Sequence, residues 1–423
     1  MPRGALLLAL LLTACGGSSA PEPPPVVETP AAESTPEPTP EATPASPAVA
    51  HPAAAHRGEA IAQLTQVVER EAGNPANAWA LAHGILAMGP EFKATDGRLA
   101  IEVLIDDFHK SERLPGHKGL QPFFPKTTDD GLPVEPHTDL ILKTLLEVGL
   151  PLEEPMLPRQ GAPTLERFLR SSRARSTAKP GAKGSQAFEK PDDVAWSIQA
   201  WCQGSYAGAP EEWRASNVQA ANINAIALQQ LEMLEAETWF MRQAMNEGGT
   251  VQKRRQGIFG FTCGGAHLYQ SVQACLAAGY PRDDKAQERF SKLTEIYQWR
   301  IALETKLVED AMQQAPQLAP ILYNQDVKFL GHLLESLGKA ERDGLFTPTE
   351  EERLLLEDAE GRLIAHVLQM KKLRVYEAER LAKWMAGEET RQFYLDVVGD
   401  ASHALHGLQI QEELRVKRAV SAP

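Results

Sequence analysis

Four side chains of this sequence have the chemistry of a metal or catalytic site: His137, Cys263, His267 and Asp326. Thiolate, imidazole and carboxylate are the ligand types that zinc selects in proteins. Cys263 stands four positions before His267, whereas the other two lie far away in the chain. Only the fold can therefore bring the four together. We treat them as candidate zinc ligands, and the pair Cys263 and His267 also as a candidate nucleophile and base.

Three of these residues open copies of a repeated pattern. In five copies, a polar residue is followed twelve positions later by a glycine, with an apolar segment between them. The copies run from Asn77 to Gly89, His137 to Gly149, Asp192 to Gly204, His267 to Gly279 and Asp326 to Gly338. Repeats at intervals of tens of residues are typical of stacked or circularly arranged units. We expect equivalent helices that begin at the polar residue and end at the glycine.

A longer segment with charge on one face precedes each copy. These segments cover residues 57–72, 98–109, 164–173, 211–246 and 284–314, and a sixth, 349–386, precedes a degenerate copy at 400–416. The copies are apolar on nearly all sides, as helices buried between others are. Six outer–inner hairpins predict an all-α protein whose simplest closure is an (α/α)6 toroid with the copies as its inner ring. An open α-solenoid is the alternative.

This pattern resembles the α/α toroids of terpenoid cyclases, protein prenyltransferases, lanthionine cyclases and six-hairpin glycosidases. The resemblance covers residues 57–416 at the level of the helix pattern, because no Asp-x-Asp-Asp acid, QW repeat or Cys-His-Gly motif is found. It therefore implies a fold and no activity. Prenyltransferase toroids hold zinc with Asp, Cys and His, so the ligand types of the candidate site are similar, at a different spacing.

Loop lengths indicate which end of the ring matters. The connections that enter the copies are mostly the longer ones, at residues 110–136, 174–191 and 247–266. Long loops in a compact domain are often functional, and helix N-termini favour anions. In a chain of net charge −13, these regions carry the basic residues Arg173, Arg175, Lys253, Arg254 and Arg255. We expect a basic mouth for an anionic ligand or envelope polymer, with solvated loops as the alternative.

Several histidines leave two interpretations open. His83 and His332 share one register, six residues into their copies, so they either face the interior of the ring or are core histidines. His403 and His406 have the helical i, i+3 spacing that can share a ligand. First positions of helices are also often Asp or Asn merely as caps. The candidate site would then reduce to helix caps and incidental histidines.

The cysteines leave a similar choice. Cys202 and Cys275 lie at similar heights in neighbouring copies. They either form a disulfide, as an oxidising periplasm permits, or remain two buried thiols, which is the interpretation we prefer because facing helices often hold their Cα atoms too far apart. A disulfide between them would leave Cys263 outside the pair, which hints that Cys263 has another task.

The N-terminus indicates the cell envelope. Arg3 precedes an apolar stretch, residues 4–12, that is too short to span a bilayer, as in a signal peptide. The run Leu12-Thr13-Ala14-Cys15 is similar to a bacterial lipobox. That resemblance implies a lipoprotein cleaved before Cys15 and held on the membrane by lipid on this cysteine; Gly16 favours the outer membrane. An ordinary signal peptide with a chance cysteine is the alternative.

These observations divide the chain into a signal peptide at 1–14, a lipidated Cys15 with a disordered tether to residue 56, a helical domain at 57–416 and a tail at 417–423. The tether is rich in Pro, Ala, Glu, Ser and Thr and cannot bury enough surface to fold. The acidic balance argues against a general nucleic-acid binder.

Two functions fit the sequence. The one we prefer is a tethered binding or scaffolding module that uses the basic mouth. The other is an α/α-toroid enzyme, of cyclase, transferase, lyase or hydrolase type, with a metal or His/Asp site at the same mouth.

Overall fold

A computed structural model describes residues 51–176, 179–180, 186–187, 191–215, 220–254 and 256–421. The expected signal peptide, the lipidation site Cys15, nearly all of the expected tether, and Arg255 lie outside the described residues. Within the described residues, no helix is long and apolar enough to cross a membrane.

The all-α prediction is confirmed. The described residues form thirteen α-helices and three small antiparallel sheets of two strands each. The strand pairs lie in connections between helices: β1 (Lys110–Arg113) with β2 (Leu120–Phe123), β3 (Lys179–Pro180) with β4 (Gln186–Ala187), and β5 (Glu212–Arg214) with β6 (Ala220–Asn222).

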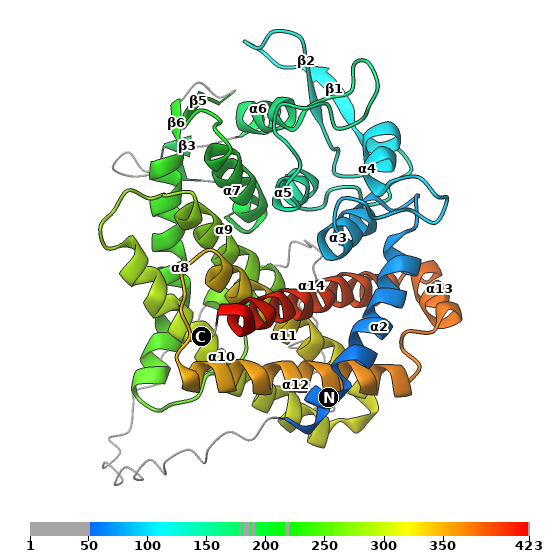
Figure 1. The fold of residues 1–423 in the computed structure, drawn as a ribbon, viewed down its shortest axis with the longest axis vertical. Coiled ribbons are helices and arrows are strands. Elements are labelled where there is room, and N and C mark those ends of the chain that lie inside the picture. Colours follow the sequence, from blue (N-terminus) through cyan, green and yellow to red (C-terminus); the bar gives the residue numbers. More distant parts are fainter. Residues whose placement is uncertain are drawn as a thin grey trace, which may run out of the picture.

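Six helices contain the repeated copies and pack on one another in sequence order. They are α3 (Ala78–Met88), α5 (Leu140–Glu147), α7 (Pro191–Tyr206), α9 (Ala266–Ala277), α11 (Ala319–Arg342) and α14 (Arg391–Ser421). Each contacts the next, and α14 packs back on α3, so that the order of contacts is closed (Figure 1). We call these six helices the inner helices.

The other helices cover the inner ones. They are α2 (Arg57–Val67), α4 (Ala100–Val103), α6 (Leu165–Arg175), α8 (Ile223–Asn246), α10 (Ala286–Gln314), α12 (Glu350–Lys372) and α13 (Ala378–Ala386). Short helical turns extend or join them: η1 (Pro52–His56), η2 (Val68–Ala72), η3 (Leu104–Phe108), η5 (Gly257–Gly260), η6 (Thr262–Gly265) and η7 (Pro316–Leu318). One hydrophobic core joins both sets, from Leu64 of α2 to Leu408 of α14.

The prediction that a glycine ends every copy is wrong for two copies. Gly89, Gly149 and Gly279 do stand at helix ends, with φ of 86°, 81° and 84°. Gly204 and Gly338 lie inside α7 and α11. A Cβ on Gly338 would come within 2.6 Å of Ile410 on α14, and one on Gly204 within 2.2 Å of Leu169 on α6. These two glycines allow close helix packing, a second use of the missing Cβ that the sequence pattern does not distinguish from a helix end.

Two predicted outer helices are shorter than expected. The segment 349–386 is divided into α12 and α13 by a turn in which Arg374 has a φ of 59°. Val375 and Tyr376, which follow, are buried, so the turn folds apolar side chains inward. In the segment 211–246 the first residues form the β5–β6 hairpin, and α8 begins only after Asn222, whose side chain accepts hydrogen bonds from the first helical N–H groups.

A disulfide joins two neighbouring inner helices. Cys202 of α7 and Cys275 of α9 are bonded, with their Cα atoms 4.9 Å apart. The helices therefore approach more closely than the preference for two free thiols assumed. Cys263 lies outside this bond.

Candidate metal centre

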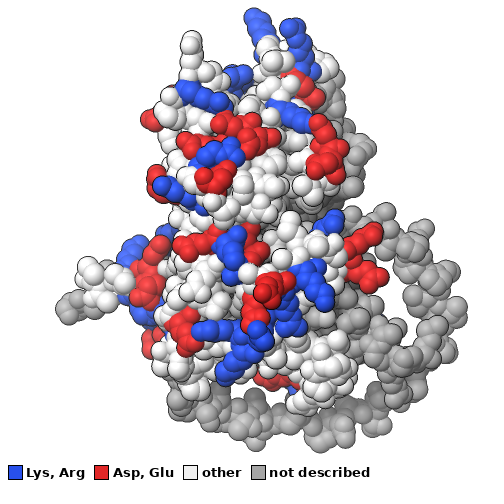
Figure 2. All heavy atoms as spheres, turned by 90° about the vertical axis from the view of Figure 1, so that its right-hand side faces the viewer, with Lys and Arg blue, Asp and Glu red and all other residues white. Residues whose placement is uncertain are grey.

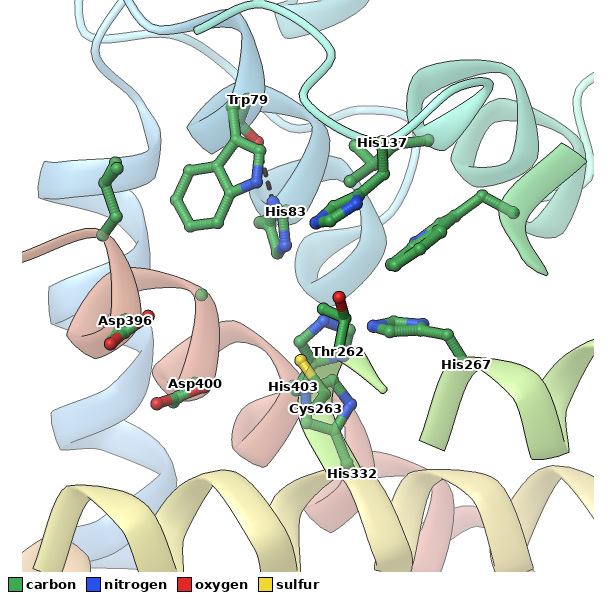
Figure 3. Close-up of a pocket in the computed structure, with 14 residues that line it drawn as sticks. Trp79, His83, His137, Thr262, Cys263, His267, His332, Asp396, Asp400 and His403 are labelled. Atoms are coloured by element: carbon green, nitrogen blue, oxygen red, sulfur yellow. Dashed lines mark hydrogen bonds between the residues drawn. The ribbon is translucent and has the colours of Figure 1, made fainter. Parts of the chain in front are cut away.

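The inner helices bring a ring of aromatic side chains to one pocket. Five of the six contribute a histidine and α7 contributes a tryptophan: His83 (α3), His137 (before α5), Trp196 (α7), His267 (α9), His332 (α11) and His403 (α14). The five histidines are labelled in Figure 3. The first residues of two copies, His137 and His267, thus meet the residues that lie six positions into two others, His83 and His332. We call this group of five histidines and Trp196 the aromatic cluster.

The members of the aromatic cluster contact one another in the order of their helices. The His137 ring stacks on Trp196 at 4.1 Å between centroids, and Trp196 lies 4.3 Å from His267. His267 is 5.1 Å from His332, which is 3.8 Å from His403, and His403 is 5.4 Å from His83. All five histidines are buried, which removes their side chains from bulk water.

Three side chains in this pocket have the spacing of a metal site. One ligand atom from each of Cys263, His267 and His332 lies within 4.8 Å of the other two. A tetrahedral zinc ion with ordinary bond lengths needs ligand atoms roughly 3.3–3.8 Å apart, so a small contraction would close the site. Sulfur and nitrogen are the donors that zinc prefers. These three residues, which we call the triad, therefore fit a zinc ion.

Unsatisfied nitrogens in the triad support this assignment. Among the described residues, both ring nitrogens of His332 and Nδ1 of His267 have no hydrogen-bond partner. Nδ1 of His332 is 3.8 Å from a carboxylate oxygen of Glu335, which is beyond hydrogen-bond distance. Buried polar atoms in native proteins nearly always have partners. A metal ion would give one nitrogen of each ring a partner.

The burial of the histidines keeps them in the form that binds metals. Burial, reinforced by the neighbouring imidazoles, holds the pKa of His267 and of His332 well below the ordinary histidine value. The same causes lower the pKa of His83 to about 3. The neutral ring, which has a free lone pair for a metal, is therefore the stable form at neutral pH.

Cys263 is held on a turn with unusual backbone angles. Cys263 and the two glycines after it all have positive φ, which costs free energy in a non-glycine residue. The Arg300 guanidinium donates to the carbonyl of Gly264 at 3.0 Å, and the Tyr297 hydroxyl donates to that of Gly265 at 2.7 Å. These bonds from α10 fix the turn and place Cys263 over the buried histidines. The Gly-Gly bend thus brings Cys263 and His267 into one pocket.

Two further histidines of the pocket are oriented by hydrogen bonds at Nδ1. Nδ1 of His403 is 2.7 Å from Oε2 of Glu335, and Nδ1 of His83 is 2.7 Å from the carbonyl oxygen of Trp79. A carboxylate and a carbonyl can only accept, so Nδ1 donates in both cases and the lone pair is on Nε2. Histidines at metal sites are oriented in this way by a second group.

Glu335 connects the aromatic cluster to a layer of buried charges. Its carboxylate accepts from Lys339 at 2.5 Å and from His406 at 3.2 Å, besides His403. Lys339 also pairs with Glu147, which lies 2.5 Å from Lys143. Although burial alone would raise it, Lys339 and His403 hold the pKa of Glu335 well below the ordinary value. The carboxylate is therefore charged and fully paired.

The space inside the pocket is small. About 20 Å³ remain between the side chains, which is room for roughly one water molecule or an ion. Thr262 and two carboxylates of α14, Asp396 and Asp400, complete the wall (Figure 3). Cys263 is half-buried, so the triad is nearest to solvent on its side.

The structure brings together three of the four residues expected at this site. His137, Cys263 and His267 line the pocket, but Asp326 does not. Asp326 lies 2.9 Å from His366 of α12, because it stands inside α11 and not at its start. It is six residues, or about 240° around a helix, from His332, so the two side chains point to different sides. The expected convergence of Asp326 is wrong, and His332 takes its place.

The outcome at the other first positions is mixed. Asn77 caps α3 by accepting from the N–H of Ala80 at 3.0 Å, which agrees with the alternative interpretation of that position as a helix cap. The side chain of Asp192 lies outside the described residues.

The expected basic mouth is not part of this pocket. Arg173 is buried and donates to the carbonyls of Pro210 and Trp201, while Arg175 pairs with Glu112 at 2.7 Å. Lys253 pairs with Glu304 at 2.6 Å, and Arg254 bonds Gln252. None of the four lines the pocket. On the face drawn in Figure 2, basic and acidic side chains are interspersed without a basic patch.

Sequence reasoning missed one residue that organises the site. Glu335 stands three positions after His332 on α11, and it bonds both His403 and His406 of α14. The i, i+3 spacing of His332 with Glu335, matched by that of His403 with His406, was the available signal. It was weak because such spacings are common on helices.

Comparisons with protein-family models, with curated proteins and with solved structures find no match to this chain.

Proposed function

We propose that this chain is an α/α-toroid enzyme that uses a zinc ion held by Cys263, His267 and His332. The observation that carries the proposal is the triad itself: three zinc-type donors within 4.8 Å of one another, with buried imidazole nitrogens that lack partners in the described part of the chain. Closed contacts among the six inner helices support the (α/α)6 toroid as the architecture over the open solenoid.

The number of ligands favours catalysis over a purely structural ion. Structural zinc sites usually have four protein ligands, whereas catalytic sites have three and an open position. His403 does not complete the triad as a fourth close ligand, and the pocket has room for about one water. Zinc in such a position lowers the pKa of water and polarises a substrate carbonyl or phosphoryl group.

The neighbouring side chains would handle the proton. His403 accepts a proton at Nε2, because its Nδ1 donates to Glu335. Burial lowers the pKa of His403 below the ordinary histidine value, and the negative charge of Glu335 opposes this by stabilising the imidazolium. Trp196, which stacks on His137 and lies 4.3 Å from His267, would shield that side of the triad from water. A hydrolytic reaction is the chemistry that this set serves best.

The localisation expected from the sequence is also part of this proposal. We place the domain in the cell envelope, anchored to the outer membrane by lipid on Cys15. The binding module with a basic mouth is the second candidate, but its support is weaker because Arg173, Arg175 and Lys253 already have partners within the protein.

Metal analysis of the purified protein tests the first step. We expect one zinc per chain in the wild type and its loss in His267→Ala and in Cys263→Ser. His56→Ala is the matched control, because His56 is exposed and far from the triad in the sequence. Zinc binding that is unchanged in both triad variants would contradict the assignment.

A second measurement separates catalysis from binding. We expect zinc-dependent hydrolysis of para-nitrophenyl acetate that falls in His403→Gln at saturating zinc, since the general base is removed while the triad stays. Hydrolysis that is equal in the presence and absence of zinc would show that the ion has no catalytic part.

A further inference from the structure

A second, larger cavity lies at the opposite end of the inner helices. It has a volume of about 660 Å³, within the range of roughly 300–1,000 Å³ that small-molecule sites occupy. Its walls include the C-terminal ends of the inner helices α5, α7, α9 and α11. The aromatic cluster instead contains residues near the start of α5, α7 and α9. The layer of buried charges around Glu335 separates the two.

Four glutamines from two facing helices line this cavity: Gln199 and Gln203 of α7, and Gln270 and Gln273 of α9. Three of them use the amide nitrogen inside the protein. Gln199 donates to the carbonyl of His267 at 3.2 Å, and Gln273 donates to the carboxylate of Asp343 at 2.9 Å. Neither acceptor can donate, so the orientation of both amides is determined.

The orientation of Gln270 follows from a chain of hydrogen bonds. Its Nε2 lies 3.0 Å from Oγ of Ser336, and that hydroxyl donates to the carbonyl of His332 at 2.7 Å. Because the Ser336 hydrogen is committed to His332, Ser336 must accept from Gln270. The amide oxygen of Gln270 is therefore the atom left over.

The amide oxygens that remain have no partner. Among the described residues, Oε1 of Gln203, of Gln270 and of Gln273 are buried without a hydrogen-bond partner. Gln270 and Gln273 are 1% and 3% exposed. Leaving a buried acceptor unsatisfied is costly, so three such acceptors on side chains that line one cavity favour a ligand that donates hydrogen bonds to them once the amides turn toward it.

The charges around the cavity indicate that this ligand is neutral. Glu147 pairs with Lys143 and Lys339, and Lys339 pairs with Glu335. Asp343 accepts from Gln273 and pairs with Arg342, the other basic residue of the lining, at 3.7 Å. Each of these acids and the two lysines is paired within the protein. A charged ligand would have to break one of these pairs, whereas neutral hydroxyl groups would not.

The edge of the cavity is apolar and carries an aromatic ring. Leu150, Pro151 and Leu152 form one side, and the ring of Tyr206 stands 80% exposed at the end of α7. An exposed aromatic ring offers a flat surface to the C–H face of a sugar. Hydroxyl donors combined with apolar faces are characteristic of saccharides.

We propose that the cavity lined by Gln203, Gln270 and Gln273 binds a short neutral oligosaccharide, with its hydroxyls donating to the three amide oxygens and one sugar packed on Tyr206. This site is separate from the triad and does not depend on zinc.

Calorimetric titration of the purified protein with maltotriose, cellotriose and tri-N-acetylchitotriose tests the proposal. We expect at least one trisaccharide to bind. Its affinity should fall about tenfold in Gln270→Met, which keeps the side-chain volume but removes the acceptor together with the donor to Ser336, and by a similar factor in Tyr206→Ala. Gln243→Met, on the exposed part of α8, is the matched control and should bind as the wild type does.

Two outcomes would overturn the proposal. One is that none of the three sugars binds to the wild type, which would leave ordered water as the partner of the amide oxygens. The other is binding of the neutral peptide N-acetyl-trialanine amide in place of every sugar. Tyr206→Ala changes an exposed side chain, so its result stands even if Gln270→Met does not fold. Zinc content should be unchanged in Tyr206→Ala.

Discussion

The two ends of the inner helices hold buried polar side chains of different kinds. At one end, five histidines line a pocket of about 20 Å³, and at the other, four glutamines line a cavity of about 660 Å³. Both ends contain buried polar atoms without partners in the described residues. Nitrogen lone pairs around a space for one ion suit a metal, whereas amide acceptors around a large space suit a hydroxyl-bearing molecule. The same helices can therefore serve two chemistries.

The charged layer between the two ends should give the largest effect when it is broken. In Lys339→Met, Glu147 and Glu335 lose a shared buried partner, which we expect to destabilise the protein by about 3–5 kcal/mol. Urea unfolding measures this difference. Lys306→Met is the control, because the pair of Lys306 with Asp310 is exposed and should contribute about 0.5 kcal/mol or less. Equal losses in the two variants would show that burial of the pair is unimportant.

The disulfide between α7 and α9 supports both ends, so its loss should affect them together. We expect Cys202→Ser to lower the free energy of unfolding by about 3 kcal/mol. A reducing agent should have the same effect on the wild type and on Cys263→Ser, since Cys263 is not in the bond. If the reducing agent changed nothing, the bond would not be present in solution.

Glu335→Gln should distinguish the two ends. This change removes a negative charge 3.8 Å from Nδ1 of the proposed ligand His332, and we expect zinc affinity to fall about 10–100-fold in a chelator competition. Oligosaccharide binding should not change, because Glu335 does not line that cavity. Glu341→Gln, on the same helix but paired with Arg418 elsewhere, is the control. A similar loss of zinc in that control would contradict a specific role for Glu335.

The smallest effect we expect is on the pH dependence of stability through Glu304, which pairs with Arg300 beside the turn at Cys263. Although burial alone would raise it, Lys253 and Arg300 hold the pKa of Glu304 below the ordinary 4.5. A lowered pKa in the folded state stabilises the protein above pH 4.5, and this stabilisation is lost as the pH falls. The stability advantage of the wild type over Glu304→Gln should therefore shrink on acidification, as thermal unfolding at several pH values would show. An advantage that grows in acid would contradict the lowered pKa.

Much of the helix arrangement could be predicted from the sequence. The apolar copies and the charged segments before them have the periodicity of helices, and Asn77 or Gly89 mark real helix ends. The errors occur where one residue type has two uses. Gly338 lies inside a helix because α14 packs closely against it, and no local pattern distinguishes that use from a helix end.

The candidate site could be predicted less completely. His137, Cys263 and His267 were found because they open copies or stand beside one. Asp326 was misplaced because α11 begins at Ala319, before its copy, so that Asp326 lies inside the helix and faces α12 while His332 faces the pocket. Glu335 was missed because its role depends on a helix nearly seventy positions away in the chain.

By itself, the sequence determined the all-α class and the near-equivalence of the inner helices, because helical periodicity and helix-ending residues act over a few positions. The tertiary structure decided which copy residues share a pocket, how closely Cys202 and Cys275 approach, and that glutamines far apart in the chain line one cavity. These outcomes depend on the rotation and offset of each helix against its neighbours. Packing between distant segments sets both, and a repeated pattern in the sequence does not encode them separately.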